Sequence, residues 1–251
     1  MVYNSLTEAP RNLKECIDWL VALKGTSKFN TQALGFALYK FLVDKPVGTL
    51  LIPSLEKVKR LSKEFLEHED LRNRSYVKDL LSRFKEPMNK DHYRLRAMVS
   101  DNTESDYENF VKSRGFTADD IARNVRAIVS NCEIILENVK NPDQYNSAYS
   151  SEATWAASCS KNPEACAVIL VGIAPMLYAG IESLRDETEY ANRTEQSETD
   201  KDFRKVLKAL GYVEPEYRDG LSRSDVCKAV TNMHPRILPT IYDVAGFWAF
   251  Y

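Results

Sequence analysis

Apolar side chains recur every three or four residues along most of the chain, which is the period of an amphipathic α-helix and not of a strand. The clearest stripe alternates at intervals of four and three: Ile121, Val125, Ile128, Cys132, Ile135 and Val139. Thr117 precedes it at a capping position, and Asp119 and Asp120 follow in the first turn, where the helix dipole favours acids. The pattern predicts a helix over residues 117–139 that packs lengthwise against its neighbours. A coiled-coil dimer through the same stripe is the alternative.

Shorter stripes of the same period predict further helices on both sides of this one. We expect them over residues 12–24, 33–42, 54–65, 77–84, 107–111, 203–210, 224–230 and 235–245, with a short helix inside 145–155. The period is lost at 85–103, 141–152 and 186–200, which are expected to be connections. The acidic stretch 186–202 is expected to form an exposed, mobile loop.

The most apolar stretch runs from Ala165 to Ile181 without a charged residue. Its seventeen residues are at the lower limit for crossing the hydrocarbon core of a membrane. It contains glycine, proline and tyrosine, and no basic residue adjoins either end. We therefore interpret it as a central helix over about 164–186, buried on nearly every side, and expect no membrane span.

These elements predict an all-α fold, an irregular multi-helix bundle around the central apolar helix at about 164–186. There is no internal repeat and no alternating apolar run long enough for a sheet. We expect residues 1–251 to form a single helical domain, with a possible division near 141–152.

Composition narrows the class of protein further. Thirty-four basic residues face 36 acidic ones, and the formal net charge is −2. The apolar fraction of 44% is that of an ordinary folded domain, which excludes a disordered tail or a collagen-like repeat. The charge balance argues against a nucleic-acid-binding protein, and the basic patch at 83–96 is diluted by acids. No secretory signal is visible at the N-terminus.

Five cysteines are too few for a disulfide framework. Cys159 and Cys166 lie close together in sequence, so a disulfide between them is possible in an oxidising medium. Two small buried thiols are an equally good interpretation. Cys16, Cys132 and Cys227 are expected in the core.

No stretch of the sequence carries a signature of catalysis. The three histidines have no metal-ligating partner at a suitable spacing, and the motifs of hydrolases, phosphate-binding loops and dinucleotide-binding folds are missing. We expect no catalytic, cofactor-binding or metal-ligating residue, and no enzymatic activity. Two glycosylation triplets begin at Asn73 and Asn192.

The last seven residues form the aromatic sequence AGFWAFY. Phe247, Trp248, Phe250 and Tyr251 would favour aggregation if they were exposed to water. Either they dock into the bundle, or the chain is a piece of something longer whose continuation covers them, and both can hold. They are therefore a candidate partner surface.

Residues 5–25, SLTEAPRNLKECIDWLVALKG, resemble the N-terminal motif of the variant erythrocyte surface antigens of Babesia parasites. The matching positions are Leu6, Thr7, Pro10, Asn12, Leu13, Lys14, Glu15, Ile17, Asp18 and Trp19. The final residues IYDVAGFWAFY resemble the end of the first segment in related parasite proteins. Within the predicted helix, Trp19 is expected to be a core or edge anchor and not a ligand contact.

The resemblance implies a protein exported to the surface of the infected red cell, subject to antigenic variation and engaged in adhesion to host cells and immune evasion. Its partner would be a host receptor or a sibling antigen subunit. Members of the family are typically longer, with a membrane span and a Cys/Lys-rich region that do not appear in this sequence. We therefore expect the N-terminal part of a longer architecture, or a short soluble relative, with variation concentrated at 85–103 and 186–200.

Two other functions stay open from the sequence. The first is an intracellular structural or scaffold subunit with no role at the surface. The second is a helical small-ligand carrier or enzyme that uses a cavity beside Ala165–Ile181.

Overall fold

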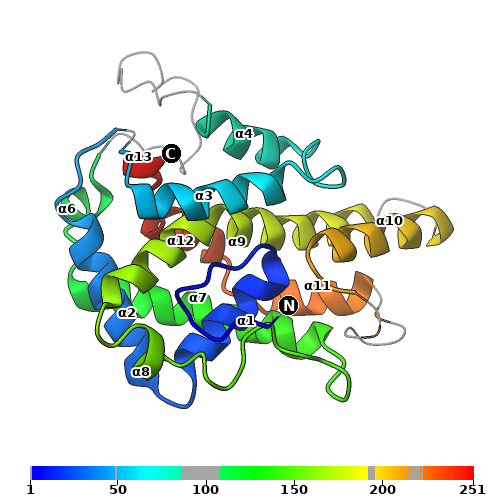
Figure 1. Ribbon diagram of the computed structural model, residues 1–251. Coiled ribbons are helices and arrows are strands. Elements are labelled where there is room, and N and C mark those ends of the chain that lie inside the picture. Colours follow the sequence, from blue (N-terminus) through cyan, green and yellow to red (C-terminus); the bar gives the residue numbers. More distant parts are fainter. Residues whose placement is uncertain are drawn as a thin grey trace.

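The computed structural model describes residues 2–48, 50–85, 108–191, 196–213 and 223–251, together with Pro215 and Leu221; side chains are described outside 189–200. The structure is 65% helical and has no strand in the described part (Figure 1). The predicted all-α class is confirmed.

Twelve helices lie within these residues. They are α1 (Leu13–Lys24), α2 (Lys28–Leu42), α3 (Pro53–Leu66), α4 (Ser75–Arg83), α6 (Phe110–Ser113), α7 (Ala118–Val139), α8 (Trp155–Ser158), α9 (Pro163–Ala191), α10 (Gln196–Ala209), α11 (Arg223–Thr231), α12 (Ile237–Val244) and α13 (Phe247–Phe250). Most predicted helices appear within a few residues of their expected bounds. Ser224 lies inside the first turn of α11 and does not precede it.

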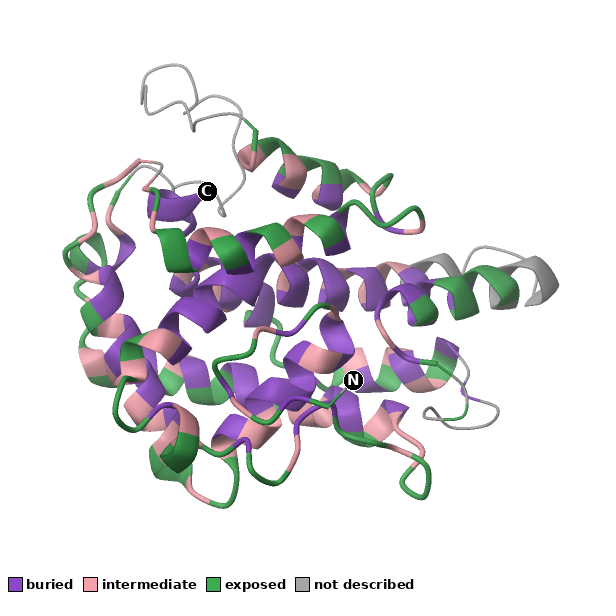
Figure 2. Cartoon of the chain, viewed as in Figure 1, coloured by how far each residue is buried: buried purple, intermediate pink, exposed green. Residues whose placement is uncertain are grey.

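Helix α9 is the central element of the bundle. It contacts α1, α2, α3, α4, α10, α11 and α12, and Figure 2 shows it buried along most of its length. By length and composition, the stretch from Pro163 to Thr188 is the one described helix that could cross a membrane, but 83% of its most apolar window is buried inside the protein. The predicted bundle around a central apolar helix is confirmed.

Helix α7 is the second long element, and its predicted cap is present. Thr117 accepts a hydrogen bond from the backbone N–H of Asp120, whose carboxylate accepts from the N–H of Thr117, so two free donors of the first turn are satisfied. All six residues of the predicted stripe are buried against neighbouring helices. Gly35 of α2 lies against α7 so closely that a Cβ built there would overlap the Cα of Ala122.

The prediction of a loop over 186–202 is wrong for residues 186–191 and 196–202, and residues 192–195 lie outside the described part. Helix α9 continues to Ala191, and α10 begins at Gln196. Four of its seventeen residues are Glu, and it also contains one Gln, one Lys, one Arg and one Ala, all of which favour helices. Its hydrophilic composition therefore did not exclude a helix, and Glu187 and Thr188 at its start are buried. Most of the predicted connection at 85–103 lies outside the described residues.

The aromatic residues of α13 are buried, so the prediction that they form a partner surface is wrong. Phe247, Trp248, Phe250 and Tyr251 are each at most 1% exposed. The Tyr251 hydroxyl donates to the carbonyl of Val171 in α9, at 3.0 Å. Backbone N–H groups of Gly48 and Leu50 donate to carbonyls of Trp248 and Ala249. Apolar burial and these bonds together dock α13 into the bundle, which was the other expectation for this segment.

The connection at 141–152 does not separate two cores in the described structure. Helices from before it (α1, α2 and α3) contact α9, which follows it, and α11 and α12 contact α7. Tyr3 pairs with the connection itself, since its N–H donates to the carbonyl of Ala148 and its carbonyl accepts from Ser150.

Candidate functional site

Residues of the N-terminal motif take part in a hydrogen-bond network that joins α1 to the segment before it. Asn12 caps α1 by accepting a hydrogen bond from the N–H of Glu15, at 2.9 Å. The Glu15 carboxylate in turn accepts from the Tyr3 hydroxyl (2.9 Å) and from the N–H of Arg11 (2.8 Å). These bonds fix the extended segment that precedes α1 against the helix.

A buried ion pair lies on the next turn of α1. The Lys14 ammonium is 3.2 Å from the Asp18 carboxylate, and Asp18 also accepts hydrogen bonds from the Tyr145 hydroxyl and the N–H of Ala148. Burial raises the pKa of Asp18, although Lys14 and the two hydrogen bonds oppose this rise. The pair connects α1 to residues 145–148. Together with Trp19, which is fully buried, it gives the motif a structural role.

The cysteines fall into three classes. Cys159 and Cys166 form a disulfide that links the end of α8 to the first turn of α9, with their Cα atoms 6.0 Å apart. Cys16 and Cys132 are free and buried, as expected. The expectation that Cys227 lies in the core is wrong, because α11 buries Val226 and Ala229 and leaves Cys227 partly exposed.

A groove of about 560 Å³ lies where α9 begins, and we call it the α3–α9 groove. Three segments line it: the N-terminal segment with Thr7 and Ala9, helix α3 from Ser54 to Leu61, and residues 162–169. The last of these includes part of the loop that the disulfide closes. Three features that are distant in sequence thus meet at one surface.

The α3–α9 groove combines an apolar floor with charged groups at its rim. Val58, Val168 and Ile169 line it and are almost fully buried. Lys57 of α3 and Glu164 of α9 line it as exposed residues, and neither forms an ion pair with another residue of the described structure. The groove can therefore accept an apolar group beside one positive and one negative charge.

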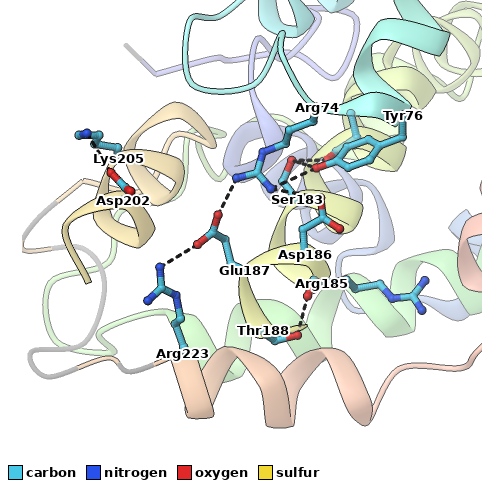
Figure 3. A network of polar contacts seen from close by, with 11 residues as sticks. Arg74, Tyr76, Ser183, Arg185, Asp186, Glu187, Thr188, Asp202, Lys205 and Arg223 are labelled. Carbon is cyan, nitrogen blue, oxygen red and sulfur yellow. Dashed lines mark hydrogen bonds and ion pairs between the residues drawn. The ribbon is translucent and has the colours of Figure 1, made fainter. Parts of the chain in front are cut away.

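A second polar cluster lies toward the other end of α9 (Figure 3). The Glu187 carboxylate binds two guanidinium groups, Arg74 at 2.6 Å and Arg223 at 3.0 Å, and so joins α9 to α11 and to the residue before α4. Tyr76 and Ser183 share a hydrogen bond of 2.9 Å beside it. Burial opposes the charge of Arg74, but Tyr76 and Glu187 together hold the pKa of this guanidinium above its ordinary value.

Sequence reasoning missed this cluster. Its three charged members are far apart in the chain, and Glu187 lies in the stretch that was expected to be a loop. The described residues contain no group of three or more His, Cys, Asp or Glu side chains that could hold a metal ion. The chain matches no family model, no curated protein and no solved structure.

Proposed function

We propose that this chain is a non-enzymatic, exported module that binds another protein, as a variant surface antigen of the Babesia erythrocyte type does in adhesion and immune evasion. The α3–α9 groove is the observation that carries the proposal. Its walls are built by the motif segment, which gives the resemblance, and by the disulfide loop. Its size lies within the range of ligand-binding pockets.

The charges of the groove indicate what kind of surface it would bind. A partner would place an apolar side chain on the floor formed by Val58, Val168 and Ile169. An acidic group would lie near Lys57 and a basic group near Glu164, because complementary charges favour correct association. A host receptor or a sibling antigen subunit with such a segment would fit.

The Cys159–Cys166 disulfide supports the exported location. Disulfides persist in oxidising surroundings and are rare in a reducing cytosol. The intracellular scaffold, which is the alternative from the sequence, does not call for this bond.

The location is tested by labelling intact infected red cells with a membrane-impermeant amine reagent, followed by mass spectrometry of this chain. Labelling before lysis is expected. Labelling only after lysis would reject the surface role and favour the intracellular scaffold.

Binding is tested with the purified chain on cultured host endothelial cells. Lys57→Glu reverses a charge that lines the groove, whereas Arg60→Glu makes the same change three residues further along α3, at an exposed position outside the lining. We expect Lys57→Glu to weaken binding about tenfold, as the loss of one charged hydrogen bond would, and Arg60→Glu to leave it unchanged. Equal effects of the two variants would reject the groove as the binding surface.

A further inference from the structure

Two neighbouring cavities lie between α9 and α11, and we call them the α9–α11 cavities. They share no lining residue with the α3–α9 groove. Their volumes are about 470 and 400 Å³. Thr188, Cys227 and Thr231 line both of them, so the two cavities meet along these side chains. Asn138 of α7 borders the larger one.

The lining of these cavities is cationic. Arg223 and Lys228 line the larger cavity, and Arg185 lines the smaller one beside His234, whose Nδ1 accepts a hydrogen bond from the N–H of Arg236. No acidic residue of the described structure lines either of them. This distribution is unusual for a chain whose acidic residues outnumber its basic ones, 36 to 34.

Acids that pair with these cations lie outside the cavities. Glu187 holds Arg223 at 3.0 Å and also binds Arg74, which pairs with Asp186 as well (Figure 3), and Glu182 is 3.3 Å from Arg185. Asp225 is 3.8 Å from Lys228 and both side chains are exposed, which makes a weak pair. Because the pair with Asp225 is long and exposed to water, Lys228 can exchange it for an anion that enters the larger cavity.

The other lining residues give the two cavities different chemical environments. Amide and hydroxyl groups of Asn138, Ser224 and Asn232 line the larger cavity beside the cations. Val230, Met233 and Ile237 line the smaller one. An anionic head with hydrogen-bonding oxygens fits the first environment, and a small apolar body fits the second.

We propose that the α9–α11 cavities bind a small organic phosphate or sulfate ester. Its anionic group lies in the larger cavity between Arg223 and Lys228, and its apolar part extends into the smaller one. Arg223 is suited to this task because its planar guanidinium matches the oxygens of a phosphate or sulfate and is held in place by Glu187. The site is separate from the α3–α9 groove and does not depend on the function proposed for it.

Cys227 provides the readout, because it lines both cavities and is the partly exposed free thiol of the described structure. The full chain is treated with iodoacetamide, which is uncharged, and alkylation of Cys227 is followed by peptide mass spectrometry. At a concentration ten times the dissociation constant, phenyl phosphate or phenyl sulfate is expected to slow alkylation about tenfold by mass action. The more protective ester identifies the preferred head group.

Lys228→Glu tests the assignment, with Lys208→Glu as its matched control on the exposed face of α10. Each variant is compared with and without the ester, since the substitution itself alters the surroundings of the thiol. Protection is expected to be lost in Lys228→Glu and kept in Lys208→Glu. The proposal is overturned if neither ester protects Cys227, if benzyl alcohol protects it equally well, or if Lys228→Glu is protected like the unmodified chain.

Discussion

The indole N–H of Trp19 donates a 2.8 Å hydrogen bond to the carbonyl oxygen of Leu6, and neither residue has any exposed surface. This bond links α1 to the extended segment before it. The same segment supplies Thr7 and Ala9 to the wall of the α3–α9 groove. Trp19 therefore positions the groove wall without lining the groove.

Replacing Trp19 by Phe is expected to lower the free energy of unfolding by about 3 kcal/mol. The substitution leaves the buried carbonyl of Leu6 without its donor and removes part of a packed ring system. Urea denaturation measures the change. Trp155→Phe is the control, because Trp155 is only half-buried and should tolerate the same replacement. Similar losses in both variants would contradict the role given to the Trp19–Leu6 bond.

The close contact of Gly35 with Ala122 predicts the effect of a second substitution on the free energy of unfolding. In an isolated helix, alanine is better than glycine by about 1 kcal/mol. Here we expect Gly35→Ala to destabilise the protein by about 3 kcal/mol or more, because the new methyl group would collide with the backbone of Ala122 and force α2 and α7 apart. Lys40→Ala, at an exposed position of α2, should be close to neutral in the same thermal or urea unfolding. A stabilising Gly35→Ala would refute the close crossing.

The sequence predicted the fold where apolar side chains follow a helical period, as in α7, and where they form one long uncharged run, as in the first two thirds of α9. It could not reveal which helices cross closely, because a glycine such as Gly35 shows its purpose only when Ala122 is opposite it. It also failed from Glu187 onward, where a polar stretch predicted a loop. Hydrophilic composition decided neither point here: helix formation depends on propensity, and Glu187 is buried because Arg74 and Arg223 pair with it.

The candidate sites were less predictable than the fold. The Cys159–Cys166 pair was suggested by sequence proximity, and a cavity beside Ala165–Ile181 was one of the alternatives. Nothing in sequence indicated that Lys57 would lie on the same groove as Thr7 and Glu164. Such a site arises from contacts between distant segments, and no local period or motif encodes them.

The buried pair of Lys14 and Asp18 should behave as a unit. Asp18→Leu alone removes the carboxylate that faces a buried ammonium and is expected to cost about 3–5 kcal/mol. The double variant Lys14→Met/Asp18→Leu should be less destabilised than the sum of its single variants, by about 1–3 kcal/mol. A double-mutant cycle in urea gives this coupling. Strict additivity would show that the two side chains do not stabilise each other.

The disulfide should be detectable from the intact mass of the protein and should raise its free energy of unfolding. Native protein is expected to gain the mass of two hydrogen atoms on reduction of Cys159–Cys166. Cys159→Ser/Cys166→Ser should be less stable by about 2.5 kcal/mol, the value expected when a loop this short is no longer closed in the unfolded chain. Intact mass measured with and without reductant, and unfolding of the variant, check both statements. An unchanged mass would show that the native cysteines are reduced.

Alkaline pH should destabilise the protein through its two buried thiols. Burial raises the pKa of Cys132 from 9.0 to about 12 and raises that of Cys16 well above 9.0. In the unfolded chain both thiols lose their protons near the ordinary value, while in the folded chain they stay protonated. The folded state then binds more protons, so stability is fully present below about pH 8.5 and falls as the pH rises, by about 1.4 kcal/mol per pH unit for each thiol.

The slope of the free energy of unfolding against pH distinguishes this effect from a general loss of stability at high pH. Cys16→Ala/Cys132→Ala is expected to start from a lower free energy of unfolding, because it leaves cavities, but to show a flatter dependence between about pH 8.5 and 10. Above that range the buried Tyr212 and Tyr251 contribute with the same sign, because burial also raises their pKa values. Cys227→Ala, which removes a partly exposed thiol, serves as the control. Urea denaturation at several pH values should give parallel lines for the control and the unmodified chain, and a common slope for all three proteins would refute the assignment to Cys16 and Cys132.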